Sequence, residues 1–131
     1  MRFLALDHGA ARTGVAVSDE TGTIVRPVGV VARVETDAGF ADLLRLLRDE
    51  APERVVVGLP VSLDGTEHTQ ARRARAFAAR LAAVVKVPVE LYDERFTSKL
   101  ADQRGGRAPR DARAAAALLE DYLRTSGEQR P

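Results

Sequence analysis

The sequence predicts an α/β fold, in which a mixed five-stranded sheet carries helices on both faces. Two apolar segments lie close together at the N-terminus, within Arg2–Asp7 and Val15–Ser18, and a third lies within Thr23–Val31. Because short turns separate these three segments, we expect them to form an antiparallel meander. Two later apolar segments are reached through helical patterns, so we expect them to run parallel to the central strand.

The N-terminal half is expected to supply three strands and one helix. Tight turns are predicted at His8–Gly14 and at Asp19–Gly22. Pro27 interrupts the third strand, which indicates an edge strand or a bulge. Asp37 is expected to cap a helix that ends near Pro52. The apolar residues of this helix recur at three- and four-residue spacing, at Phe40, Leu43, Leu44 and Leu47.

The C-terminal half is expected to supply two strands and the remaining helices. Arg54–Leu59 is a continuous apolar run, as expected for a strand covered on both faces. After a loop at Pro60–Gly65, one apolar helix face is marked by Ala71, Ala74, Phe77, Ala78 and Leu81. Val87–Tyr92 is the predicted fifth strand. A short helix is expected after Thr97 or Ser98.

The chain is expected to end in a helix that follows a flexible connector. The connector is Gly105–Pro109. The apolar positions of the last helix are Ala112, Ala115, Ala116, Leu119 and Leu123. A frayed tail is predicted from about Thr125 to Pro131.

The composition predicts one soluble cytoplasmic domain spanning residues 1–131. A chain of 131 residues is long enough for a single core. It contains no cysteine, which excludes disulfides, zinc fingers and thiol catalysis. The N-terminus enters a strand at once, without the pattern of a signal peptide. No apolar run is long enough to span a membrane.

The charge balance is close to neutral, although arginine dominates the basic residues. The formal net charge is +1, and 18 of the 20 basic residues are arginine. Such a balance does not by itself indicate nucleic-acid binding. Arginine offers a planar fork suited to phosphate, whereas a bias in base composition explains much of the same excess.

Three acidic positions stand where the predicted topology brings chain segments together. Asp7 ends the first strand, Asp93–Glu94 follows the fifth, and Asp111 precedes the last helix. Each has an ordinary explanation on its own: a turn residue, a surface salt bridge and a helix cap. Because ligand sites lie at the carboxyl ends of parallel strands, the acids are expected to converge. Clustered carboxylates repel one another unless a divalent cation screens them, and Mg²⁺ and Mn²⁺ prefer oxygen ligands.

Four motifs, in order along nearly the whole chain, resemble those of the YqgF/RuvX family. They are Leu6–Ala16, then Val57–Pro60 with Asp64–Thr66, then Asp93–Ser98, and last Asp111–Ala115. Two positions depart from the family pattern. Ser98 stands where threonine is more usual, and Ala5 where glycine is frequent. Neither departure affects a carboxylate.

The resemblance implies an RNase H-like fold and a nuclease. Members of the family are described as Holliday junction resolvases and as nucleases that trim the 5′ end of precursor 16S rRNA. Their acidic triad carries over onto Asp7, Glu94 and Asp111, as catalytic residues and as ligands of Mg²⁺ or Mn²⁺. The resemblance therefore implies a metal-dependent hydrolase that cleaves phosphodiesters, either in precursor 16S rRNA or in branched DNA. A nucleic-acid-binding module without catalysis is a further alternative, and the sequence leaves monomer and homodimer undecided.

Several basic residues are candidates for contact with nucleic acid. Arg12 and Arg95 either clamp a phosphate or pair with a nearby acid. Arg104, Arg107 and Arg110 flank the glycine-rich connector beside Asp111, where contact with a nucleic-acid backbone is expected. Other polar residues have plainer interpretations. His8 is expected to be a turn residue at the rim of the site. A solvated helix face is expected from Arg72, Arg73, Arg75 and Arg80.

Overall fold

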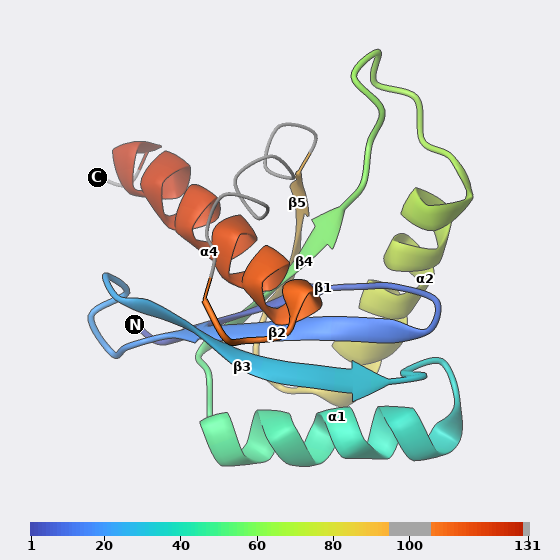
Figure 1. The fold of residues 1–131 in the computed structure, drawn as a ribbon, viewed down its shortest axis with the longest axis horizontal. Helices are drawn as coiled ribbons and strands as arrows, with labels where there is room; N and C mark the ends of the chain where they lie inside the picture. The colour runs from blue at the N-terminus through green and yellow to red at the C-terminus, as the bar shows by residue number, and fades with distance from the viewer. Residues whose placement is uncertain (95–105, 130–131) are drawn as a thin grey trace.

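The computed structural model describes residues 1–94 and 106–129, the last four of them by their backbone alone. The elements, in chain order, are β1 (Phe3–Asp7), β2 (Arg12–Ser18), β3 (Val25–Ala32), α1 (Asp37–Glu50), β4 (Arg54–Leu59), α2 (Thr69–Val84), β5 (Val89–Asp93) and α4 (Arg110–Gln129). The five strands form one sheet, with α1 and α2 on one face and α4 on the other (Figure 1). The predicted α/β class, with a mixed five-stranded sheet and helices on both faces, is confirmed.

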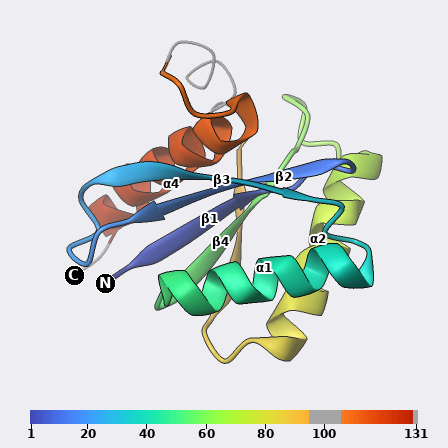
Figure 2. The same cartoon turned by 60° about the horizontal axis from the view of Figure 1, so that its bottom comes forward.

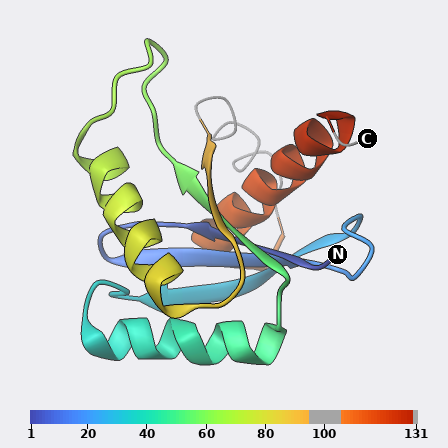
Figure 3. The same ribbon diagram turned by 180° about the vertical axis from the view of Figure 1, so that it is seen from behind.

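The strand order of the sheet is β3-β2-β1-β4-β5. β1 pairs antiparallel with β2, and β2 antiparallel with β3. β4 runs parallel to both β1 and β5. The carboxyl ends of β1, β4 and β5 therefore lie at the same edge of the sheet, which can be followed from behind in Figure 3. This is the edge at which the predicted acids are placed.

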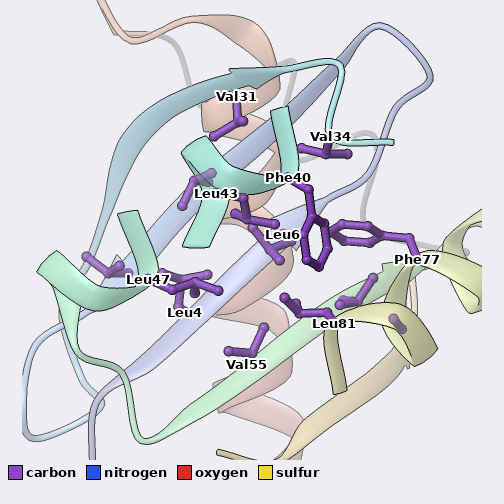
Figure 4. Packing of buried hydrophobic residues seen from close by; sticks show 14 residues of the cluster. Leu4, Leu6, Val31, Val34, Phe40, Leu43, Leu47, Val55, Phe77 and Leu81 are labelled. Carbon is purple, nitrogen blue, oxygen red and sulfur yellow. The ribbon is translucent and has the colours of Figure 1, made fainter. Parts of the chain in front are cut away.

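Alternate residues of each central strand pack against opposite helical layers, which Figure 2 shows on either side of the sheet. In β1, Leu4 and Leu6 face α1 and α2, while Phe3 and Ala5 face α4. The larger core lies on the α1–α2 side, where Phe40 and Phe77 lie close together in Figure 4. The same alternation determines on which face of the sheet the side chains at the strand ends lie.

The turns and the edge strand differ in part from the predictions. β2 begins at Arg12, so the turn between the first two strands spans residues 8–11 and is shorter than the predicted turn at 8–14. The prediction for Pro27 is confirmed on both counts, because β3 is an edge strand and its pairing with β2 shifts register between Val15 and Ala16, where the partners are Gly29 and Pro27. The missing N–H of proline is tolerated at such a position.

The helix ends also differ from the predictions. Thr36, and not Asp37, is the N-cap of α1, because its hydroxyl accepts a hydrogen bond from the Gly39 amide. α4 continues to Gln129, although the sequence predicts a frayed tail from Thr125, since extending an existing helix needs little further stabilisation. The helix predicted after Thr97 or Ser98 lies outside the described residues. Within the described ranges, no helix is both long and apolar enough to cross a membrane.

Candidate active site

Asp7 reaches the candidate site because it is the last residue of β1. Its register partner in β2 is Gly14. The alternation of β1 carries Phe3, Ala5 and Asp7 to the α4 face of the sheet. The Asp7 carboxylate therefore emerges where the strand ends and where α4 begins to cover the sheet.

Asp111 is brought to Asp7 by a close contact between α4 and β2. A Cβ atom on Gly14 would lie 1.8 Å from the Asp111 carbonyl oxygen, so the backbone of the first turn of α4 rests directly on this glycine. Asp111 is half-exposed, and it lies inside the first turn of α4, which begins at Arg110. The structure thus explains the proximity of Asp7 and Asp111 through the absence of a side chain at position 14.

Glu94 reaches the same face of the sheet from the end of β5. Its backbone amide donates a hydrogen bond to the Leu59 carbonyl, at 3.2 Å, which ties it to the end of β4. Its carboxylate lies above Gly58, where a Cβ atom would come within 2.3 Å of Glu94 Oε2. Leu118 of α4 bounds the same space, 3.0 Å from that Cβ position. The acid therefore occupies room that a larger residue in β4 would fill.

The electrostatics couple Asp7 to both of the other acids. The pKa of Asp7 is raised to about 6, chiefly by burial and also by the Asp111 charge, while Arg110 opposes the shift. Burial also raises the pKa of Glu94 to about 8, with added contributions from Asp7 and Asp93. Asp7 is thus the central member of the three. The Asp7 and Glu94 carboxylates are destabilised as anions until a cation or a proton compensates them.

Asp111 is paired with Arg12 in this arrangement. Arg12 Nε lies 3.2 Å from Asp111 Oδ2, and the Arg12 side chain is largely exposed while that of Asp111 is half-exposed. Of the two expectations for Arg12, pairing with an acid is the one observed. Within residues 1–94 and 106–129, no three Asp, Glu or His side chains lie close enough together to hold a metal ion as they stand. The oxygen chemistry of Asp7, Glu94 and Asp111 and their mutual repulsion nevertheless fit a divalent cation.

The other predicted residues fall into two groups. Arg107 and Arg110 are exposed, the first just before α4 and the second at its start. Arg110 is close enough to Asp7 to lower the pKa of that carboxyl. Arg95 and Arg104 lie outside the described residues.

His8 lies in the turn after β1, as the sequence predicts, but its side chain is buried and does not stand at the rim of the site. Its side chain is only 3% exposed and its ring stacks on Phe77 of α2, with centroids 4.8 Å apart. Burial lowers the pKa of His8, while Glu35 opposes that shift. The alternation of β1 explains the difference, since His8 follows Asp7 and turns to the opposite face.

Two residues that shape the site, Gly14 and Gly58, are absent from the predicted site residues. Both are glycines inside strands, and such glycines often mark a close approach of another segment. That signal was available in the sequence, although it does not identify the segment that approaches.

Comparisons with known proteins relate nearly the whole chain to one group. A family described as "RuvX: Holliday junction resolvase" matches residues 1–125. A protein of Anaeromyxobacter sp. (strain Fw109-5), called "Putative pre-16S rRNA nuclease", is 42% identical and the match covers 94% of this chain and 96% of that protein. A protein of the same name from Maridesulfovibrio salexigens is 36% identical, with 94% and 98% covered.

Solved structures show the same architecture at low sequence identity. RuvC of Thermus thermophilus is 19% identical with a TM-score of 0.57, and the match covers 96% of this chain and 97% of that one. The resolvase of Fowlpox virus, solved with Holliday junction DNA, is 11% identical with a TM-score of 0.54 and coverage of 98% and 97%. At such identities the likeness concerns the fold. It confirms the RNase H-like class, with the same mixed sheet.

Proposed function

This chain belongs to the RuvX family, and from that premise we propose that Asp7, Glu94 and Asp111 form its metal-dependent active site. The chain is a nuclease that hydrolyses phosphodiester bonds in nucleic acid. One observation carries the assignment of the site: Asp7 interacts electrostatically with both Asp111 and Glu94, at the edge where β1 and β5 end. Acids so distant in sequence would not otherwise be expected to share one corner of the fold.

The proposed cofactor is Mg²⁺ or Mn²⁺, held by the oxygens of these three side chains. When bound, such an ion activates a water molecule and stabilises the leaving oxygen of a phosphodiester. The protein contributes partly buried carboxylates whose pKa values are raised. Protons held by Asp7 and Glu94 would be released as the cation binds, because metal ligands must be deprotonated.

Arg12 and Arg110 are proposed to hold the substrate phosphate beside the acids. Both side chains are exposed, and both lie next to members of the triad: Arg12 contacts Asp111, and Arg110 acts on Asp7. A guanidinium group matches the oxygens of a phosphodiester in a bidentate contact. Arg107 extends this basic surface along the segment before α4.

The proposed substrate is the 5′ end of precursor 16S rRNA. The support is the shared name of relatives that are 36–42% identical over nearly their whole length. A four-way DNA junction is the second candidate, supported by the description of the matching family. Symmetric cutting of a junction needs two active sites and hence a dimer, so a monomeric mass in solution would argue against this second candidate.

A side-by-side cleavage assay tests both proposals. It offers a precursor 16S rRNA 5′ fragment and a four-way DNA junction to the full chain, with Mg²⁺, with Mn²⁺ and with chelator. We expect metal-dependent cleavage of the RNA, and its loss in Asp7→Asn without loss of the fold. Asp49→Asn is the matched control, because this exposed acid lies on α1. Full activity of Asp7→Asn would contradict the site assignment, whereas cleavage of the junction alone would contradict the RNA substrate.

A further inference from the structure

His8 is buried on the face of the sheet opposite to Asp7. Three chain segments meet on its ring: the turn after β1, α2 and the loop between β3 and α1, which lie together in Figure 1. The ring stacks on Phe77 with an interplanar angle of 27°. His8 Nε2 is buried and lies 3.4 Å from Glu35 Oε1, a long separation for a hydrogen bond, and it has no hydrogen-bond partner within residues 1–94 and 106–129.

Burying an imidazole at this position is energetically unfavourable. A buried nitrogen that makes no hydrogen bond loses its hydration without full compensation. The aromatic partner of the ring is Phe77, in a stacked geometry.

The backbone between His8 and Asp7 receives little support from the sheet. The parallel pairing of β1 with β4 ends at Leu6 and Val57, and the antiparallel pairing with β2 ends at Asp7 and Gly14. The following turn is crowded, since a Cβ atom on Gly9 would lie 2.4 Å from the Arg12 carbonyl oxygen. We therefore expect a displacement of His8 to move the neighbouring Asp7 as well, because the crowded turn leaves little room for other adjustments.

We propose that His8 is a positioning residue for the metal site: its stacked ring ties the turn after β1 to α2 and so fixes the orientation of the Asp7 carboxylate. This inference rests on the proposed function, because it takes Asp7 as a metal ligand. His8 itself touches neither metal nor substrate in this scheme. The geometry of the site is thus set in part from the face of the sheet that carries α1 and α2.

The test compares three variants by Mn²⁺ affinity, measured by electron paramagnetic resonance without nucleic acid, and by kcat and KM for the cleaved substrate. His8→Ala removes the stacked ring, and we expect Mn²⁺ affinity to fall about 10-fold or more, as for outer-shell partners of metal ligands. We expect kcat to fall ~100-fold with KM little changed, as for a misplaced catalytic group. His8→Phe keeps an aromatic ring against Phe77 and should restore both quantities to near the wild-type values.

Leu81→Ala is the matched control for simple loss of packing. Leu81 is fully buried in α2, in the core cluster that contains Phe77, so we expect its truncation to destabilise the protein while His8 stays stacked on Phe77. We expect Leu81→Ala to keep its Mn²⁺ affinity at a temperature where all variants are folded, as checked by circular dichroism. Unchanged Mn²⁺ affinity in His8→Ala, an equal loss in Leu81→Ala, or no rescue in His8→Phe would each overturn the positioning role. A wild-type chain that neither binds Mn²⁺ nor cleaves would instead contradict the proposed function itself.

Discussion

Glu94 places its carboxylate over Gly58, the one residue of β4 without a side chain. Position 58 faces α4, as does Val56 two residues earlier, so any side chain there would project into the space that Glu94 occupies. A Cβ atom would lie 2.3 Å from Glu94 Oε2 and 3.0 Å from Leu118 Cδ2. The glycine therefore makes room for an acid that belongs to another strand.

Gly58→Ala is expected to lower activity far more than stability. The added methyl group must displace the Glu94 carboxylate, since the neighbouring Leu118 is packed in the core. A displacement of about 1 Å can cost ~100-fold in rate, whereas overpacking at one site costs about 1–3 kcal/mol. The measurement is kcat at saturating metal beside the free energy of unfolding. Gly29→Ala in β3 is the control, because a Cβ atom there meets no atom of the described residues within 4 Å. Equal activities of the two variants would contradict the role given to Gly58.

Gly14→Ala is expected to disrupt the contact between β2 and α4. The added Cβ atom would lie 1.8 Å from a backbone oxygen, which cannot rotate away as a side chain can. The first turn of α4 must then move, and Asp111 moves with it. We expect a loss of stability of about 3 kcal/mol or more, at the upper end of overpacking effects. Urea denaturation measures this loss, and a midpoint equal to that of wild type would show that α4 adapts without cost.

The elements could be predicted largely because apolar segments and turns are local features of the sequence. Arg54–Leu59 is apolar at nearly every position and forms β4, the middle one of the three parallel strands. The ends of elements were predicted less well, because neighbouring residues compete for the same role. Thr36 caps α1 in place of Asp37, and α4 extends through Thr125 to Gln129. Such choices depend on small differences in backbone energy that the sequence pattern does not reveal.

Only the part of the candidate site that follows from strand direction could be predicted from the sequence. Parallel pairing of β1, β4 and β5 brings Asp7 and Glu94 to one edge of the sheet, as the sequence predicts. The contacts that support them depend on tertiary packing, which no local pattern encodes. Gly14 lies against α4, which is almost a hundred residues later in the chain, and His8 is buried against Phe77 of α2.

Arg12→Gln is expected to weaken binding of nucleic acid while leaving stability nearly unchanged. The ion pair with Asp111 is exposed, with side-chain exposures of 69% and 39%, and such pairs contribute about 0–1 kcal/mol. Loss of one phosphate contact should lower the slope of log K against log salt by about 1. Fluorescence anisotropy over a salt series, in chelator, measures this slope. Arg45→Gln is the control, because Arg45 pairs with Asp42 on α1. An unchanged slope would indicate that Arg12 pairs with Asp111 and does not contact the nucleic acid.

The metal-free protein is expected to lose stability as the pH rises from about 4 to about 8. Within that interval the unfolded chain releases the protons of Asp7 and Glu94, whose ordinary pKa values are 3.8 and 4.5, while the folded chain retains them until about pH 6 and about pH 8. The folded state then binds more protons, so its stability falls by up to ~1.4 kcal/mol per pH unit for each group.

Glu94→Gln removes the larger of the two pKa shifts. Its melting temperature should therefore depend less on pH and exceed that of wild type at pH 8. Added Mg²⁺ should stabilise wild type more than this variant, because a bound cation compensates the Glu94 anion. Glu20→Gln, an exposed residue between β2 and β3, should follow wild type throughout. A wild-type melting temperature that rises from pH 5 to pH 8 without metal would contradict the proposed burial of these acids.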